Sequence, residues 1–425
     1  MLRFQTKDEY RFSRICYIIE AALEYFISIM VTGAFLARIT SSLGFSDSLT
    51  GILSSFVSLG CLFQLGSIQL FGKLSKVKRP IIFGHVVNQL LFSLVYLTPV
   101  LELSQEKKTV LFLICFCGAF VITNLISPTK TSWMLGLIDD RQRGIFTARK
   151  EIVSLLGGMT FTYLMGNLID YLEAVGNQRL AFIAGACTVF ALMILHTLSL
   201  VPIKQKAMKQ PTASRGKGTF ELLKDKMFVR IVLIGVLWHI ASGCAQPFYG
   251  AYQIKELGFS MTFVSVLSIA YSIVRVAFSP MIGRYADRTS FAHMVSVCFS
   301  VAAAGFLVNA FTVPENGRVF YTIYHCLSAI SMAGINSAMT NLICDYIHGD
   351  TRRNALAINA SLGGVSGFLT TCLVSPLVDL VQKNGNKIGE MTVYPAQLVS
   401  ALAFMLTTLL VVYIRLFVIK PVQKA

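Results

Sequence analysis

Long apolar runs, separated by short polar segments, recur along the whole chain. Each run approaches the roughly 20 residues that an α-helix needs to cross about 30 Å of hydrocarbon. Because backbone groups in lipid must find their hydrogen-bond partners within the protein, runs of this length predict transmembrane helices. The sequence predicts twelve spans, six in each half, over residues 15–38, 49–71, 80–101, 108–135, 145–171, 178–201, 229–252, 261–283, 290–312, 318–346, 355–381 and 394–418.

A short sequence near the start of the chain reappears in its second half. Residues 43–46 and residues 257–260 both read Leu-Gly-Phe-Ser, at an offset of 257 − 43 = 214 residues. Two weaker matches follow in the same order, residues 72–75 with 283–286 and residues 140–143 with 350–353, at offsets of 211 and 210 residues. We therefore predict an all-α membrane protein of two pseudo-symmetric six-helix bundles, a plan that suits alternating access between two halves.

The two predicted bundles are joined by a polar, basic segment. The N-terminal bundle is expected over residues 1–201 and the C-terminal bundle over residues 229–425, with a linker over residues 202–228. The linker contains several lysines, two prolines and two glycines. A partly flexible tether of this kind suits two bundles that move against each other.

The composition excludes most soluble functions. Hydrophobic residues make up 55% of the chain and charged residues only 14%, more apolar surface than a soluble domain buries. The sequence has no G-x-x-x-x-G-K-[ST] element for binding nucleotide phosphates and no long polar segment to house an enzyme. We expect no enzymatic activity, no cofactor and no metal, since the ten cysteines lie within predicted spans and the six histidines have no ligand spacing.

The positive charge is explained by membrane topology rather than by nucleic acid. Of the 37 Lys and Arg residues, 27 fall on the side of the predicted spans that holds both termini, 8 fall on the other side, and Lys130 and Arg275 lie within spans. Positively charged loops remain in the cytoplasm. We therefore predict a multi-pass protein of the cell membrane with both termini in the cytoplasm and the lipid bilayer as its surroundings.

One loop carries a recognisable motif. Residues 283–288 read Gly-Arg-Tyr-Ala-Asp-Arg between the eighth and ninth spans, and this resembles the G-x-L-A-D-R loop motif of the major facilitator superfamily, with Tyr285 in place of the usual Leu. Arg143-Gly144 after the fourth span is similar to the Arg-Gly element common in that superfamily. The chain therefore resembles a bacterial-type member of the major facilitator superfamily with twelve transmembrane helices. This resemblance implies the major facilitator fold.

The resemblance implies a latch on the cytoplasmic side. Asp287 is expected to face the start of the fifth span, where the helix dipole and nearby guanidinium groups favour a carboxylate. The residues of this latch are Gly283, Arg284, Asp287, Arg288, Arg143 and Arg149. The first-half copy of the motif has Lys76 in place of the acid, so the latch is expected to be asymmetric. The alternative is that Asp287 is a solvated loop charge.

Two carboxylates lie in the first predicted span. Glu20 and Glu24 are four residues apart, so they share one helix face. A charge at this depth costs about 2.5–3.5 kcal/mol, and the resemblance implies that the first helix lines a central cavity. They are the proton-coupling candidates, unless Glu20 is wetted from the cytoplasm. Lys130 either pairs with them or extends to the cytoplasmic surface.

Other polar residues within the spans are candidates for the substrate cavity. Arg275 has Gln64 as its first-half counterpart at the offset of 211 residues. The seventh span presents polar and aromatic side chains beside a proline, which suits stacking on a polar solute, although an interfacial belt explains it equally well. The candidates are Arg275, Gln64, Asn124, Trp238, His239, Gln246 and Asn336. Isolated Asn residues also serve as hydrogen-bonding glue between helices.

Together these features predict a secondary active transporter. We expect alternating access, proton-coupled symport of a small polar organic solute, and a monomer. The alternatives are an exporter or antiporter of amphipathic compounds and a receptor-like member that transports nothing. Fold alone does not choose among substrates.

Overall fold

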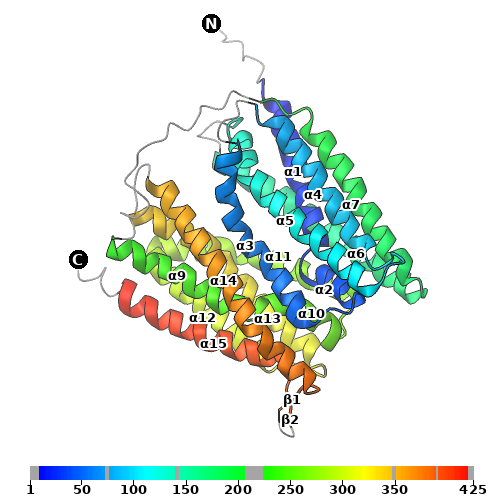
Figure 1. Ribbon diagram of the computed structural model, residues 1–425. Coiled ribbons are helices and arrows are strands. Elements are labelled where there is room, and N and C mark those ends of the chain that lie inside the picture. The colour runs from blue at the N-terminus through cyan, green and yellow to red at the C-terminus, as the bar shows by residue number, and fades with distance from the viewer. Residues whose placement is uncertain are drawn as a thin grey trace. The chain divides into compact units, whose positions relative to one another are not determined.

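The computed structural model describes residues 9–71, 76–138, 143–205, 224–346, 351–388 and 391–419, and nearly all of them are helical (Figure 1). The helices of the first half are α1 (Arg11–Met30), α2 (Gly33–Ser42), α3 (Asp47–Phe71), α4 (Lys78–Leu97), α5 (Gln105–Leu135), α6 (Arg143–Ala174) and α7 (Gln178–Leu200). The second half contains α9 (Lys226–Gly243), η2 (Gln246–Phe248), α10 (Tyr249–Ala251), η3 (Tyr252–Glu256), α11 (Met261–Arg288), α12 (Phe291–Ala310), α13 (Gly317–Tyr346), α14 (Thr351–Lys383), α15 (Pro395–Ile414) and η4 (Arg415–Ile419). A two-stranded hairpin, β1 (Lys387–Ile388) and β2 (Met391–Thr392), precedes α15.

Each predicted span coincides with helical structure, and the all-helical membrane fold is confirmed. Within the described residues, nine helical segments are long and apolar enough to cross a bilayer, and α1 with α2 forms a tenth that is bent by 41°. Gly33, at φ +55°, lies at this bend. The seventh span changes its helical form at η2, where Pro247 lacks the N–H that an unbroken helix needs.

The repeated Leu-Gly-Phe-Ser sequence makes the same turn twice. Gly44 ends α2 and Gly258 ends η3, both in the left-handed region, at φ +70° and +60°. The following serines cap the next helices: Ser46 Oγ accepts from the Leu49 N–H and Ser260 Oγ from the Phe263 N–H, each at 3.1 Å. A left-handed residue and an N-cap therefore explain why this sequence occurs at both places.

The chain packs as two compact units. Unit 1 comprises Met1–Phe35 and Phe63–Thr212, and unit 2 comprises Leu36–Leu62 and Ala213–Ala425. In unit 1, α4 packs against α5 and α7, while α1 packs against α6 and α7. In unit 2, α12 packs between α13 and α15, and α9 packs against α14. Most of the predicted linker, residues 206–223, lies outside the described residues.

Residues 36–62 are attached to the second half of the chain by polar contacts within unit 2. Lys255 Nζ lies 2.6 Å from Asp47 Oδ1 and donates to the Phe45 carbonyl at 2.8 Å. Gln382 Nε2 donates to Asp47 Oδ2 at 2.6 Å. Because Asp47 and Lys255 are largely buried, this contact joins α3, η3 and α14 at one end of the unit.

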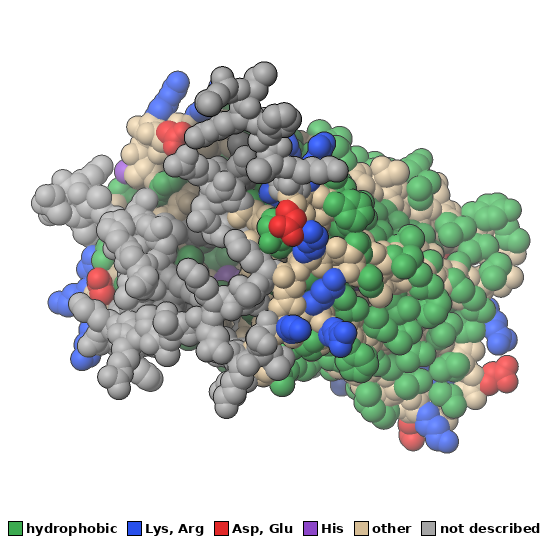
Figure 2. Space-filling view, turned by 90° about the horizontal axis from the view of Figure 1, so that it is seen from above, with side chains coloured by type: hydrophobic (Ala, Val, Ile, Leu, Met, Phe, Trp, Pro, Cys, Tyr) green, Lys and Arg blue, Asp and Glu red, His purple; other side chains and the backbone are tan. Residues whose placement is uncertain are grey.

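Large apolar side chains are exposed along the outer helices. Ile114 on α5, Leu198 on α7 and Leu409 on α15 are all mostly exposed, and Leu373 on α14 is 81% exposed. In Figure 2, which is seen from above the view of Figure 1, hydrophobic side chains cover a broad area on the right, and several Lys and Arg side chains gather near the middle of the view. An apolar flank with charged ends is the surface that a bilayer requires.

Glycines permit close packing between helices in both units. A Cβ placed on Gly157 of α6 would lie 2.7 Å from Phe26 of α1. A Cβ on Gly363 of α14 would lie 2.7 Å from the His239 ring of α9. These separations are shorter than van der Waals contact, so any larger residue must displace its neighbour.

We predict that Gly157→Leu destabilises the protein by about 1–3 kcal/mol, because the added side chain overlaps the Phe26 ring. Thermal unfolding of the purified protein measures this change. Gly118→Ala on α5 is the control, since a Cβ there meets Leu91 at an ordinary 3.5 Å. Equal melting temperatures for Gly157→Leu and the parent protein would show that α1 and α6 do not pack in this way.

Candidate functional site

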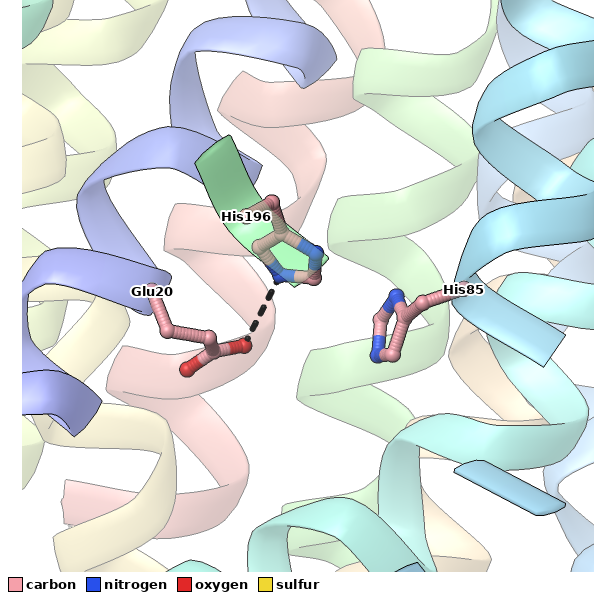
Figure 3. A group of neighbouring side chains, drawn as sticks. All are labelled: Glu20, His85 and His196. Carbon is pink, nitrogen blue, oxygen red and sulfur yellow. Dashed lines mark hydrogen bonds and ion pairs between the residues drawn. The ribbon is translucent and has the colours of Figure 1, made fainter. Parts of the chain in front are cut away.

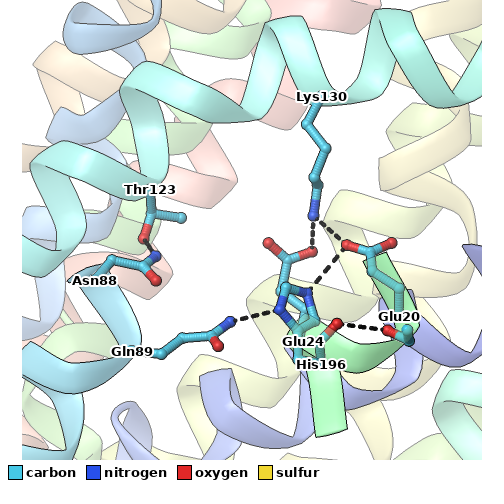
Figure 4. Close-up of polar contacts among 8 residues, drawn as sticks. Glu20, Glu24, Asn88, Gln89, Thr123, Lys130 and His196 are labelled. Atoms are coloured by element: carbon cyan, nitrogen blue, oxygen red, sulfur yellow. Dashed lines mark hydrogen bonds and ion pairs between the residues drawn. The ribbon is translucent and has the colours of Figure 1, made fainter. Parts of the chain in front are cut away.

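Two carboxylates and one ammonium group form the centre of a polar cluster inside unit 1. Glu20 and Glu24 lie one turn apart on α1 and point at Lys130 of α5 (Figure 4). Lys130 Nζ lies 2.6 Å from Glu20 Oε1 and also donates to Glu24 Oε2. Lys130 is buried, so it pairs with the carboxylates instead of extending to the cytoplasmic surface.

An imidazole extends the cluster away from Lys130. His196 Nε2 of α7 lies 3.2 Å from Glu20 Oε1, and Gln89 Nε2 of α4 lies 3.0 Å from His196 Nδ1. With the Gln89 amide nitrogen facing it, Nδ1 accepts a hydrogen bond, and Nε2–H then donates to Glu20.

A second imidazole lies beside the first. The ring of His85 on α4 faces that of His196, with 4.8 Å between their centroids (Figure 3). One turn along α4, Asn88 Nδ2 donates to Thr123 Oγ1 of α5 at 2.6 Å. Four helices therefore direct polar side chains into one small volume.

Several buried atoms of the cluster lack hydrogen-bond partners within the described ranges of the chain. They are Glu20 Oε2, both ring nitrogens of His85, Asn88 Oδ1 and Gln89 Oε1. Buried polar atoms are nearly always paired, because leaving one unpaired costs about 1–3 kcal/mol. These atoms therefore need further hydrogen-bond partners, which water or a bound solute can supply.

Exposure differs sharply between the two carboxylates. The side chain of Glu24 is 34% exposed, whereas those of Glu20 and His196 are both 0% exposed. Glu24 is therefore the member of the cluster that a solute or water can reach. Glu20 and His196 lie behind it in the packed interior of unit 1.

The charges of the cluster do not balance. Two carboxylates and one ammonium leave a net charge of −1 when both histidines are neutral. An uncompensated charge in the interior is costly, and one bound proton would remove it. This imbalance distinguishes the cluster from a simple structural ion pair.

A metal ion fits this site poorly. Among the residues that the structure describes, Glu20, His85 and His196 place possible ligand atoms within 4.8 Å of one another. The Lys130 ammonium, however, already pairs with the Glu20 carboxylate at 2.6 Å, and a divalent cation there would be repelled by it. Both nitrogens of His196 are also hydrogen-bonded. The donor set favours proton chemistry.

The predicted cavity residues are divided between the two units of the chain. Gln64 and Asn124 meet, with Gln64 Nε2 donating to Asn124 Oδ1 at 3.2 Å in unit 1. In unit 2, Trp238 is buried against Phe299 and Phe306. Also in unit 2, His239 Nδ1 is hydrogen-bonded to the Gly235 carbonyl at 2.7 Å. Arg275 is half-buried and Gln246 is exposed. The side chain of Asn336 lies outside the described residues.

Helix α11 continues through the predicted latch motif. It ends at Arg288, so Gly283 is helical and the loop expected there is confined to Thr289 and Ser290. Asp287, Arg284, Arg288 and, on α6, Arg149 are all exposed. The side chain of Arg143 and the first-half copy, residues 72–75, lie outside the described residues.

Sequence reasoning found Glu20 and Glu24 but missed His85, Gln89 and His196. His85 and His196 are 111 residues apart, so no spacing rule connects them. The available signal was their position: each is a titratable residue inside a predicted apolar span, and such residues are functional candidates in membranes.

Comparison with known proteins identifies the family. The Major Facilitator Superfamily model matches residues 21–371, and the chain belongs to this family of transporters. No curated protein matches the chain in sequence.

Solved transporters share its fold. The nucleoside transporter NupG is 16% identical with a TM-score of 0.68, over 95% of this chain and 98% of that one. A D-xylose-proton symporter is 14% identical with a TM-score of 0.71, over 96% and 98%. A variant of the E. coli fucose:proton symporter FucP is 14% identical with a TM-score of 0.57, over 96% and 99%.

We predict that Lys130→Met destabilises the protein by about 3–5 kcal/mol at neutral pH, because two buried carboxylates lose their counter-ion. The loss should be smaller at pH 5 than at pH 8, since protonation of a carboxylate removes the unpaired charge. Melting temperatures measured across this pH range test the prediction.

Lys107→Met is the matched control, because Lys107 is an exposed lysine on the same helix. Adding Glu20→Gln to Lys130→Met should restore part of the stability by removing one buried charge. A pH-independent loss in Lys130→Met would argue against a charged cluster.

Proposed function

We propose that this transporter is a proton-coupled symporter of a small polar organic solute, located in the cell membrane with both termini in the cytoplasm. The observation that carries the proposal is the buried cluster in which Glu20 and Glu24 share the single ammonium group of Lys130. A cluster with one negative charge in excess binds a proton from the side to which it is open. Loss of that proton on the other side completes one transport step.

The unequal exposure of the two carboxylates supports coupling between proton and solute. Glu24 is partly exposed, so a solute that donates hydrogen bonds to it competes with Lys130 for the same oxygen atoms. Glu20 remains buried against Lys130 and His196. Solute binding at Glu24 therefore alters the electrostatic field around Glu20, because both carboxylates pair with the same ammonium group.

A polar solute is favoured by two further polar side chains in unit 1. Gln64 and Asn124 place two amides on α3 and α5, and Asn124 lies on the same helix as Lys130. Amides recognise hydroxyl and amide groups through paired donors and acceptors. The solved proteins of the same fold are named for nucleosides, D-xylose and fucose, and two of the three for proton symport.

Alternating access would use the two ends of α11. At its N-terminal end, Asp47 and Lys255 hold residues 36–62 against the second half of the chain. At its C-terminal end, about 42 Å away by helix length, Asp287 is exposed. We infer that the Asp47–Lys255 pair closes the outer side, and that Asp287 forms the cytoplasmic latch when the inner side closes.

We predict that D-xylose, fucose or uridine, added to vesicles containing the protein, alkalinises the medium as the solute enters. Glu24→Gln should abolish proton movement, because the cluster then has no excess negative charge. A pH electrode in a weakly buffered suspension measures the effect, with Glu106→Gln as control, since Glu106 is an exposed acid at the start of α5. Solute entry without proton movement would refute symport, and binding without entry would favour a receptor.

We predict that Asp287→Asn shifts the protein toward the state that is open to the cytoplasm, by about 1–2 kcal/mol, because a charge-assisted hydrogen bond is lost in the opposite state. Labelling of a cysteine introduced on the cytoplasmic side should become several-fold faster. Glu315→Gln, an exposed acid between α12 and α13, is the control. Unchanged labelling and transport rates in Asp287→Asn would rule out the latch.

A further inference from the structure

One amide in the cluster is placed to change the number of protons that the cluster holds. Gln89 Nε2 lies 3.0 Å from His196 Nδ1, and Gln89 Oε1 has no hydrogen-bond partner within the part of the chain that the structure describes. A side-chain amide presents two N–H donors at one end and a carbonyl acceptor at the other, and a half-turn exchanges them. The end that faces the imidazole decides whether Nδ1 accepts or donates.

The two amide orientations correspond to two protonation states. With Nε2 of Gln89 facing Nδ1, His196 carries one proton, on Nε2, which it donates to Glu20 Oε1. After a half-turn of the amide, Gln89 Oε1 accepts a hydrogen bond from Nδ1–H of His196. Nε2–H of His196 still donates to Glu20. His196 then carries two protons, and each has an acceptor. The states differ by one proton, and the net charge of the cluster changes from −1 to 0.

We propose that His196 stores the coupling proton on Nδ1 and that Gln89 is the positioning residue whose carbonyl accepts a hydrogen bond from it. This inference rests on the proposed function and assigns different tasks within it. Glu24 meets the solute, Lys130 links Glu24 to Glu20, and His196 holds the proton behind them. His196 and Glu20 are both 0% exposed, so a stored proton is separated from water while the solute moves.

The charges around His196 suit this role. Among the described residues of the helices packed against α7, the titratable groups near the Glu20–His196 pair are Glu24 and Tyr17 of α1 and His85 of α4, and Lys130 approaches from α5. On α6, Lys150 lies over the Tyr17 ring at 5.3 Å. The two carboxylates stabilise an imidazolium, Lys130 opposes it, and the sum with His196 protonated is zero within the cluster.

His85 supplies a route to Nδ1. Its ring lies 4.8 Å from that of His196, and neither of its nitrogens has a partner among the described residues. A neutral imidazole with a free nitrogen accepts a proton at that atom and releases one from the other. A proton that enters at His85 thus passes to Nδ1 of His196, and the Gln89 carbonyl accepts a hydrogen bond from the resulting N–H.

Nuclear magnetic resonance of the full chain in lipid nanodiscs, with nitrogen-15 in the histidine rings, tests the store directly. On acidification, one histidine with two protonated ring nitrogens should appear and should be absent from His196→Gln. Gln89→Leu should lower the pH at which half of His196 is protonated by about one to two units, because the imidazolium then lacks a hydrogen-bond acceptor for Nδ1–H. His293→Gln, which removes a ring bonded to Ser290 on α12, should leave the titration unchanged.

The proposal would be overturned if the His196 ring stayed neutral down to the lowest pH at which the wild-type protein remains folded. Transport separates this failure from failure of symport. If His196→Gln folds and retains wild-type proton movement with D-xylose, fucose or uridine while Glu24→Gln loses it, the store is refuted and symport stands. If the wild-type protein moves these solutes without protons, both proposals fall.

Discussion

Burying charge in hydrocarbon is the constraint on which unit 1 depends. Lys130 neutralises one of two carboxylates on α1, and it does so from the interior of α5. Each charge alone would cost about 2.5–3.5 kcal/mol at this depth. The ion pairs between Lys130 and the two carboxylates therefore hold α1 and α5 together. His196 of α7 and Gln89 of α4 join the cluster through hydrogen bonds, so these two helices are also held against α1. The polar cluster thereby fixes four helices around one excess negative charge.

In the proposed mechanism, that excess charge is the feature that binds the coupling proton. The exposure of Glu24 and the burial of Glu20 and His196 divide the cluster into an accessible part and a dry part. At the other end of the mechanism, Asp47 and Lys255 join residues 36–62 to the second half of the chain, so the first two spans contribute to both packing units.

The sequence predicts the helices well because lipid leaves the backbone few alternatives. Its internal repeat also locates two equivalent turns, with Gly44 and Gly258 both left-handed. It predicts the site less well. Glu20 and Glu24 stand out by helical spacing, but His85 and His196 meet only because α4 and α7 pack together. Such tertiary contacts leave no periodic signal. The motif at residues 283–288 is helical rather than a turn, since α11 runs on to Arg288.

Accumulation of solute against its own gradient tests the central claim most directly. Proteoliposomes held at zero membrane potential would be given an acidic exterior and equal concentrations of radiolabelled solute on both sides. For one proton per solute, the account predicts accumulation inside by about tenfold per unit of pH difference, because one unit corresponds to 1.36 kcal/mol. Solute that remains at equal concentrations across the pH gradient, while still exchanging between the two sides, would contradict proton coupling.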